Sequence, residues 1–235
     1  MSVRDRIAAA AVACGRAPEE ITLVAATKMN SPDAIQEAIR AGVPVCGENR
    51  VQEMLLKNSQ AAYAGSELHF IGHLQKNKVK HVVGLARLIH SVDSVSLMQE
   101  IGKTASRIGI CQDILLEVNI ALEASKSGFS AEEIPDALAA ASSCSGIRVR
   151  GLMTVPPVCD FSVNNTPYFL AMRQLFVDNS MKKYDNVYMD FLSMGMSGDF
   201  ETAIACGSNM VRVGSAIFGP RNYAKSEVPA DGLDG

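Results

Sequence analysis

The sequence has almost no excess of charge of either sign. Its 235 residues include 22 lysines and arginines and 25 aspartates and glutamates, which gives a formal net charge of -3. A chain with this balance has no overall positive field to hold a nucleic-acid backbone or an anionic membrane surface. We therefore expect neither nucleic acid nor a membrane among its partners.

The sequence also lacks long hydrophobic runs. No stretch approaches the roughly 20 apolar residues that a membrane-spanning helix needs. The segment 1–20 carries charges within its first six residues and has no long apolar stretch, so it does not resemble a secretory signal. These two absences predict a cytoplasmic protein.

Metal-binding patterns of cysteine and histidine are missing as well. The cysteines are scattered, with no C-x-x-C pair and no histidine nearby in ligand spacing: Cys14, Cys46, Cys111, Cys144, Cys159 and Cys206. His69 and His73 are four residues apart, but the segment that holds them alternates like a strand. We expect reduced, mostly buried thiols and no metal site.

No linker, low-complexity tract or charge block divides the chain. A hydrophobic content of 48% over 235 residues is enough to fill one large core. We therefore predict a single domain over residues 1–235, with a polar, frayed tail at 224–235.

The sequence does contain a regular alternation of short apolar runs and longer amphipathic segments, which predicts parallel strands joined by helices. After a first helix near 3–14, strands are expected at 21–27, 43–49, 67–73, 87–93, 113–120, 147–155, 186–195 and 210–219. Helices are expected at 31–42, 50–64, 76–86, 94–109, 130–146, 166–182 and 199–207. Local signals support them: Ser31 and Pro32 can begin a helix, and Ser130 and Glu133 have the spacing of a capping box.

The repeats predict the α/β class, as a single (β/α)8 TIM barrel with an extra N-terminal helix. Such a barrel takes about 250 residues, so this chain is long enough if its connections are short. A doubly wound open sheet is the alternative that the pattern leaves open. In a barrel, the loops that follow the strands share one face, where ligands and catalytic groups lie.

The first predicted strand is followed by Lys28. A lysine in this place can be a solvated loop charge, but in a barrel it lies on the ligand-binding face. The same face would hold Asn49, His73, Asn119, Met153, Thr154, the segment 193–197 and the segment 212–215. A lysine whose pKa is depressed by a desolvated or cationic environment attacks a carbonyl readily, so Lys28 is a candidate Schiff-base lysine.

The last two strand ends carry patterns that can hold a phosphate group. Gly195, Ser197 and Gly198 stand just before a predicted helix, which offers free main-chain N–H groups, hydroxyls and a positive dipole end. Gly214 lets an anion approach the main chain, and Ser215 can donate to it. Either loop alone could be an ordinary turn or helix cap. Together with Lys28 and the fixed charge of Arg212, they indicate a phosphorylated aldehyde held as a Schiff base.

At this point the chain resembles a known family. The segments "VAATK", "GENRVQE", "LHFIGHLQKNK", "SKSGF", "RGLMTVPP", "SMGMSGDFETAI" and "VRVGSAIFG" are similar to those of the YggS/PROSC family of pyridoxal 5'-phosphate (PLP) binding, or PLP homeostasis, proteins. The resemblance extends over residues 4–223 and implies a barrel like the N-terminal domain of alanine racemase. It implies that Lys28 carries PLP as a Schiff base.

The resemblance also implies further roles. Ser197, Gly214 and Ser215 would hold the phosphate, Arg212 would face the pyridine nitrogen, and Asn49 and Met194 would line the ring. Because arginine stays protonated, the ring nitrogen would remain unprotonated and the ring would be a weak electron sink. His73 lines the mouth or is a structural histidine. Lys76, Lys78 and Lys126 are solvated or receive PLP in transit as a second site.

Three functions of different classes are compatible with these residues. The favoured one is a non-catalytic PLP carrier or regulator, expected to be a monomer that exchanges PLP with apo forms of PLP-dependent enzymes. The alternative is a fold-type III PLP enzyme such as an amino-acid racemase, which needs a second acid/base group opposite Lys28. In racemases that group comes from a partner subunit and the site is completed by a β domain, which we do not expect here. A cofactor-free Schiff-base aldolase is the third.

Overall fold

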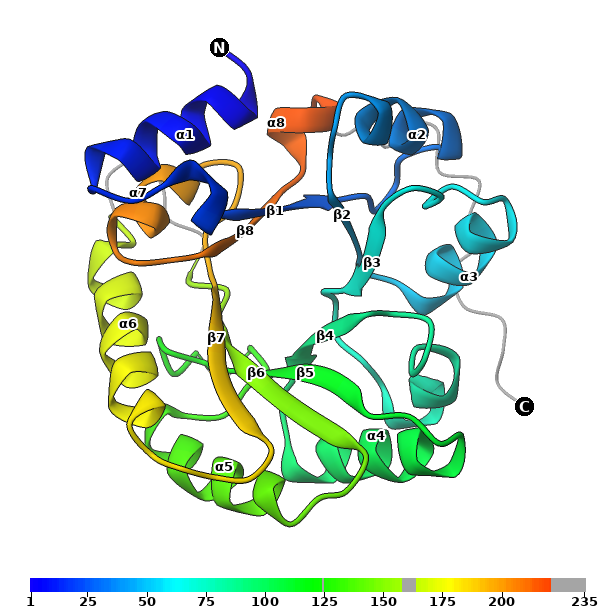
Figure 1. Cartoon of the computed structure of the whole chain (residues 1–235), viewed down its shortest axis with the longest axis vertical. Coiled ribbons are helices and arrows are strands. Elements are labelled where there is room, and N and C mark those ends of the chain that lie inside the picture. The colour runs from blue at the N-terminus through cyan, green and yellow to red at the C-terminus, as the bar shows by residue number, and fades with distance from the viewer. Residues whose placement is uncertain (124, 158–163, 221–235) are drawn as a thin grey trace.

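The computed structural model describes residues 1–123, 125–157 and 164–220. Within them the strands form a closed barrel in which each strand pairs in parallel with its neighbours in the sequence, and β8 pairs with β1 (Figure 1). The (β/α)8 prediction is confirmed, and the open sheet is wrong. Cys159 and the predicted polar tail 224–235 lie outside the described residues, and the single-domain assignment over 1–235 stays a prediction.

All of the predicted strands are present, with shorter bounds. They are β1 (Thr22–Ala26), β2 (Val45–Glu48), β3 (Glu67–Phe70), β4 (Leu88–Val92), β5 (Gln112–Glu117), β6 (Ile147–Met153), β7 (Val187–Ser193) and β8 (Met210–Val213). The prediction of a strand over 210–219 is wrong at its end, because the chain turns at Gly214 into the short helix α8 (Ser215–Phe218).

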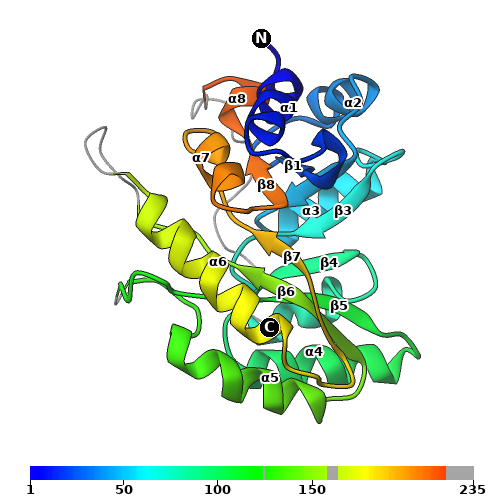
Figure 2. The ribbon, with the colours of Figure 1, turned by 60° about the vertical axis from the view of Figure 1, so that its left-hand side comes forward.

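The other helices lie outside the barrel (Figures 1 and 2). They are α1 (Val3–Ala13), α2 (Pro32–Arg40), α3 (Val51–Ser59), α4 (Val95–Arg107), α5 (Ile134–Ser142), α6 (Thr166–Ser180) and α7 (Phe200–Ala205), with 3-10 turns η1 (Pro18–Glu20), η2 (Lys76–His81) and η3 (Ala131–Glu133). The helix expected over 76–86 is thus only a 3-10 segment. The Ser31 cap and the Ser130–Glu133 capping box are both confirmed.

The buried apolar side chains form three separate clusters. Val24, Leu115 and Met210 belong to a small apolar cluster inside the barrel. The largest cluster lies between the sheet and the helices, where α4 buries Leu97 and Ile101 on one amphipathic face. The interior cluster shares the inside of the barrel with buried polar side chains such as those of His69 and His90.

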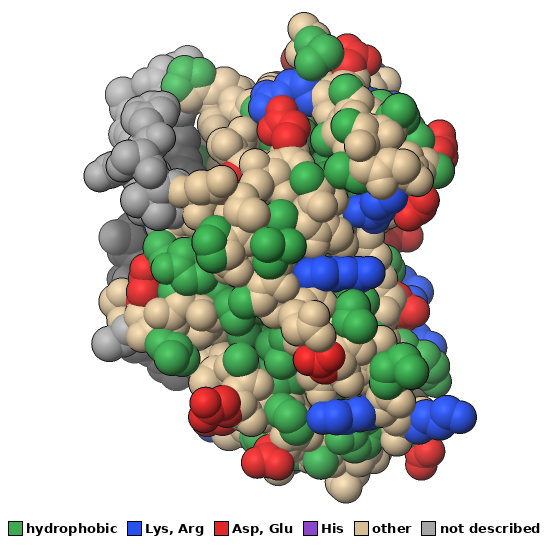
Figure 3. Space-filling view, turned by 90° about the vertical axis from the view of Figure 1, so that its left-hand side faces the viewer, with side chains coloured by type: hydrophobic (Ala, Val, Ile, Leu, Met, Phe, Trp, Pro, Cys, Tyr) green, Lys and Arg blue, Asp and Glu red, His purple; other side chains and the backbone are tan. Residues whose placement is uncertain are grey.

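Two observations describe the hydrophobic and charged side chains of the structure. Among the described residues, no helix is both long and apolar enough to cross a bilayer. On the face formed by α1, α6 and α7, hydrophobic, basic and acidic side chains are interspersed (Figure 3). This mixture agrees with the nearly balanced charge of the sequence.

Candidate functional site

Lys28 lies in a tight turn at the carboxyl end of β1. The turn includes Met29, whose φ of 61° is in the left-handed region that side chains other than glycine seldom adopt. Asn30 closes the turn, since its main-chain N–H donates to the oxygen of Thr27 at 3.1 Å and its side chain donates to the oxygen of Lys28 at 3.1 Å. The half-buried Lys28 side chain therefore extends from a turn whose main chain is held by hydrogen bonds.

A buried group of charges lies directly beneath this turn. The ammonium group of Lys57 in α3 contacts the carboxylate of Glu48 at 2.9 Å and that of Glu53 at 2.8 Å. All three side chains are buried. We call these three residues the buried charge triad. Although burial alone would raise it, the pKa of Glu53 is lowered by the hydrogen bonds from Lys57 and Met29.

The triad holds the peptide groups on both sides of Lys28. Lys57 donates to the main-chain oxygen of Thr27 at 2.9 Å, and Glu53 accepts from the main-chain N–H of Met29 at 2.8 Å. Sequence reasoning missed this arrangement. The one available signal was the i, i+4 spacing of Glu53 and Lys57, which ordinarily indicates an exposed helical ion pair.

Asn49, at the end of β2, offers an acceptor that the protein leaves unused. Its main-chain N–H donates to Glu48 Oε1 at 2.9 Å, but its side-chain Oδ1 is buried and has no hydrogen-bond partner among the described residues. Gly72 packs against the main chain of this residue, since a Cβ at that glycine would come within 2.0 Å of the main-chain oxygen of Asn49. A buried amide oxygen without a partner is costly, so its place here is consistent with a ligand contact.

The loops after β7 and β8 converge on one hydroxyl. Ser197 Oγ accepts from the main-chain N–H of Gly214 at 3.0 Å and from that of Ala216 at 3.4 Å. Two main-chain donors aimed at a single oxygen form the kind of cradle that binds an oxyanion. Ser215, between these two donors, is exposed. The structure thus brings together the three residues predicted for a phosphate.

Met194 lies in the same loop but faces away from the cradle. Its side chain is fully buried in the core cluster between barrel and helices, where Phe169 and Met172 also pack. Its main-chain N–H donates to the oxygen of Met210 at 3.1 Å. A contact of Met194 with a ring stays a prediction, and its observed role is to support the loop.

Arg212 in β8 is a second buried cation at this end of the barrel, besides Lys57. Its Nη1 donates to Ser193 Oγ at 2.6 Å and its Nη2 donates to the oxygen of Thr154 at 2.8 Å, which fixes the guanidinium plane. Burial lowers the pKa of Arg212 to about 10, although Glu117 and Asp199 oppose this effect. Arg212 therefore stays protonated at neutral pH and has further N–H donors for a ligand.

Glu117, at the end of β5, is a functional candidate that sequence reasoning missed. Burial and the nearby charge of Asp93 raise the pKa of this carboxyl to about 7, and Arg212 only partly opposes the shift. A carboxyl group that titrates near neutral pH and faces a buried arginine is unusual outside functional sites. Its sequence context, the end of an apolar strand, was the available signal.

Other predicted residues of this face have structural partners. His73 Nδ1 lies 3.2 Å from Asp93 Oδ2, and Asn119 organises its own loop by donating to the oxygen of Glu123 at 2.9 Å. Lys126 pairs with Glu123 at 2.9 Å. Lys76 is exposed and Lys78 is half-buried. No group of three or more histidines, cysteines, aspartates or glutamates within the described ranges is arranged to hold a metal ion.

The site as a whole lies at the carboxyl ends of four adjacent strands, β7, β8, β1 and β2. It combines a lysine on a rigid turn, a cradle for an oxyanion, a buried arginine and an amide oxygen of Asn49 that no described residue hydrogen-bonds. The donor set fits a molecule with one phosphate group, one reactive carbonyl and one ring acceptor. PLP has these three features.

Comparison with known proteins agrees with this site. Residues 8–222 match the family model of the alanine racemase N-terminal domain. The chain is 41% identical over 221 residues to the pyridoxal phosphate homeostasis protein of Aquifex aeolicus, an alignment that covers 94% of this chain and 96% of that protein.

Two solved structures are similar throughout the barrel. A protein of unknown function from Bifidobacterium adolescentis has a TM-score of 0.84 and 38% identity, over 92% of this chain and 91% of that one. PipY of Synechococcus elongatus, solved with PLP bound, has a TM-score of 0.79 and 28% identity, over 93% of this chain and 100% of PipY. The chain therefore belongs to the family of pyridoxal phosphate homeostasis proteins, which has the barrel of the alanine racemase N-terminal domain.

Proposed function

We propose that this protein binds PLP through a Schiff base to Lys28 and exchanges the cofactor with other proteins, without turning over amino acids itself. The observation that carries the proposal is the convergence of the Gly214 and Ala216 N–H groups on one oxygen beside the strand that positions Lys28. The Nζ amine of Lys28 condenses with the aldehyde and releases one water molecule, and hydrolysis reverses this bond.

The remaining contacts follow from the chemistry of the donors. The N–H groups of Gly214 and Ala216, with the hydroxyls of Ser197 and Ser215, bind the phosphate. Asn49 Oδ1, buried and unpartnered among the described residues, contacts the ring edge. Arg212 donates to the pyridine nitrogen. PipY, which was solved with PLP bound, supports this choice of ligand.

Arg212 is the reason to favour a carrier over a catalyst. PLP supplies an electrophilic carbon and a ring that can withdraw electrons when its nitrogen is protonated. A guanidinium group donates and cannot accept, so Arg212 keeps that nitrogen unprotonated and weakens the electron sink. Racemisation also requires a second proton-transfer group opposite Lys28. The names of the curated relatives, homeostasis proteins, agree with the carrier function.

Two assays on one preparation test the proposal. The holo-protein is incubated with L- and D-amino acids in deuterated water, and exchange at Cα is followed by NMR. In parallel, PLP transfer from the holo-protein to an apo-enzyme is measured, with the protein acting as a monomer. We expect stoichiometric PLP, measurable transfer and negligible Cα exchange. Rapid multiple-turnover racemisation would instead establish the enzyme, and failure to bind PLP would refute both.

A further inference from the structure

A row of polar side chains crosses the inside of the barrel from one mouth to the other. It begins at Arg212 in β8, whose Nη1 lies 2.6 Å from Ser193 Oγ in β7. Ser193 Oγ lies 3.1 Å from His90 Nδ1 in β4, and His90 Nε2 lies 3.0 Å from His69 Nδ1 in β3. His69 Nε2 ends the row 3.6 Å from Glu67 Oε2. We call these five residues the interior relay.

The relay is buried along its length and open at one end. Arg212 is 4% exposed, His69 is 3% exposed, and Ser193 and His90 are fully buried. The Glu67 side chain, by contrast, is 61% exposed. Buried polar groups are expensive unless each one has a partner, so this row forms a connected unit inside an otherwise apolar barrel.

The chemistry of the two ends determines the direction of every hydrogen bond. Arginine has only donors, so Ser193 Oγ accepts from Arg212, and because the row ends on the accepting carboxylate of Glu67, Ser193 turns its own hydrogen toward His90 Nδ1. His90 then carries its proton on Nε2 and donates to His69 Nδ1. His69 in turn carries its proton on Nε2, which faces the Glu67 carboxylate. Only one pair of tautomers satisfies all of these contacts.

A charge on either histidine is incompatible with this arrangement. A protonated His90 would direct Nδ1–H at Ser193 Oγ, leave the serine hydrogen without a partner and place a second cation beside Arg212. Burial, with the neighbouring charges of His69 and Arg212, lowers the pKa of His90, and burial together with Arg87 lowers the pKa of His69 to about 3.

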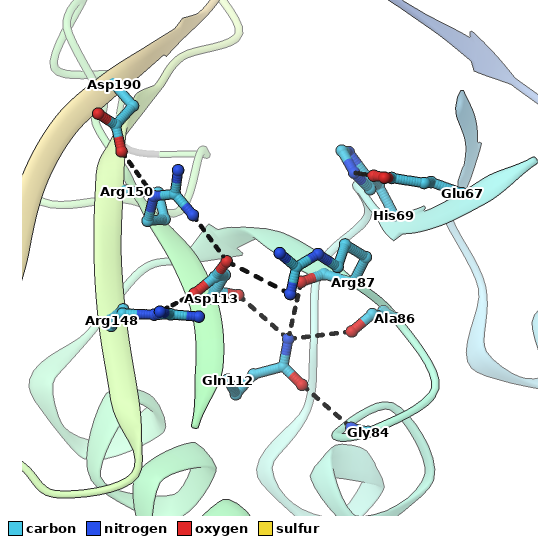
Figure 4. Close-up of polar contacts among 10 residues, drawn as sticks. All are labelled: Glu67, His69, Gly84, Ala86, Arg87, Gln112, Asp113, Arg148, Arg150 and Asp190. Carbon is cyan, nitrogen blue, oxygen red and sulfur yellow. Dashed lines mark hydrogen bonds and ion pairs between the residues drawn. The ribbon is translucent and has the colours of Figure 1, made fainter. Parts of the chain in front are cut away.

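The surroundings of the far mouth have the same effect on His69. Figure 4 shows Glu67 and His69 at the start of β3, near Arg87 and the Asp113 carboxylate. Asp113 lies 3.7 Å from Arg87, and it pairs with two further arginines, Arg148 at 2.8 Å and Arg150 at 2.9 Å. Burial and the charge of Arg87 outweigh the exposed Glu67 carboxylate, so this mouth of the barrel favours a neutral His69.

We propose that His90 and Ser193 are positioning residues for Arg212. The relay keeps both of its histidines neutral with the proton on Nε2, so that among the five relay residues Arg212 alone carries a positive charge. Its effect on PLP rests on the proposed function, but the tautomers are a property of the protein alone. The relay also connects Arg212 at the ligand site, through a row of polar contacts, to the carboxylate of Glu67 at the opposite mouth of the barrel.

The tautomers are measured directly, without PLP. Two-dimensional proton–nitrogen NMR of the histidine rings in the full chain distinguishes Nε2–H, Nδ1–H and cationic forms. Signals are assigned with His69→Asn and His90→Asn. We expect Nε2–H on both rings at pH 6 to 8. An Nδ1–H tautomer on His90, or a cationic form of either ring at pH 7, overturns the relay whether or not the protein binds PLP.

Variants then test the positioning role. Ser193→Ala removes the acceptor of Arg212 Nη1, and His90→Phe removes the partner of Ser193. We expect each to raise the PLP dissociation constant about tenfold, because the charge-assisted hydrogen bond of Arg212 is lost in Ser193→Ala and loosened in His90→Phe. Each should also shift the visible band of bound PLP, a change that we expect of Arg212→Gln as well. Ser193→Ala should also relax the His90 tautomer, a change that a merely structural role would not produce.

Matched controls separate positioning from general destabilisation. Ser208→Ala removes another fully buried hydroxyl between β7 and β8, whose hydrogen bonds within the described part of the chain go to main-chain oxygens, such as that of Met194 at 2.8 Å. His81→Phe replaces an exposed histidine. We expect both controls to keep the wild-type PLP affinity and spectrum. If the wild type binds PLP and Ser193→Ala and Ser208→Ala behave alike, the positioning role is refuted. If the wild type does not bind PLP, the proposed function fails instead.

Discussion

Lys57 donates a hydrogen bond to the main-chain oxygen of Thr27 at 2.9 Å, and Thr27 is the residue immediately before Lys28. The same ammonium group contacts the buried carboxylates of Glu48 and Glu53. The buried Lys57 thus holds the peptide group between Thr27 and Lys28, the lysine that we propose bonds to PLP. A reactive side chain that extends from a rigid segment loses less conformational entropy when a ligand binds.

Lys57→Met should destabilise the protein strongly. The substitution leaves two carboxylates buried without a counter-charge, and removing one partner of a buried ion pair costs about 3 to 5 kcal/mol. Urea denaturation would measure this loss in the free energy of unfolding. Lys103→Met, which replaces an exposed lysine of α4, should change it by less than about 0.5 kcal/mol. Similar values for the two variants would contradict a structural role for the triad.

Gly214→Ala should fold normally but lose phosphate binding. The added Cβ would lie 3.4 Å from Ala26 Cβ, an ordinary contact, and the φ of -117° suits any residue. The methyl group would nevertheless crowd an anion held by the Gly214 N–H. We expect the affinity for PLP to fall at least about tenfold while that for pyridoxal, which has no phosphate, is unchanged. Equal losses for both ligands would place the phosphate elsewhere.

Much of the fold could be predicted, because its signals are local. Apolar runs bounded by turn residues identified every strand of the barrel, and the Ser130–Glu133 spacing identified a capping box that the structure contains. The eighth strand was predicted too long, because the apolar residues after Gly214 continue the pattern of a strand although the chain turns there into α8.

The polar interior could not be predicted, because its contacts join distant segments. His69 and His90 come from different strands, and Ser193 follows His90 by 103 positions in the chain. Each residue alone reads as an ordinary strand residue. Glu117 was missed for the same reason, since its raised pKa arises from burial and from Asp93, which follows the neighbouring strand β4.

Glu117 should make stability depend on pH. Its pKa is raised in the folded protein from the usual 4.5 to about 7, so the folded state holds this proton more tightly than the unfolded state. The contribution of protonated Glu117 to the free energy of unfolding is fully present below pH 4.5, and it is lost as the pH rises through about 7. Relative to Glu117→Gln, the wild type without PLP should lose about 2 kcal/mol of unfolding free energy between pH 5 and 8.

The comparison for this prediction is Glu37→Gln, which changes an exposed glutamate of α2. In chemical denaturation, the unfolding free energy of Glu37→Gln should change with pH by the same amount as that of the wild type across this range. If Glu117→Gln also runs parallel to the wild type, Glu117 does not titrate near neutral pH.

The central claim is that Lys28 is the lysine that bonds to PLP, and one measurement tests it directly. The protein is mixed with PLP, reduced with borohydride, digested and analysed by mass spectrometry, in parallel with Lys28→Ala. Reduction converts the carbon–nitrogen double bond into a stable secondary amine, which marks the lysine that carried it. We predict one phosphopyridoxyl group per chain, on Lys28, and none in the variant. A stoichiometric adduct on another lysine, such as Lys76, Lys78 or Lys126, would contradict the account.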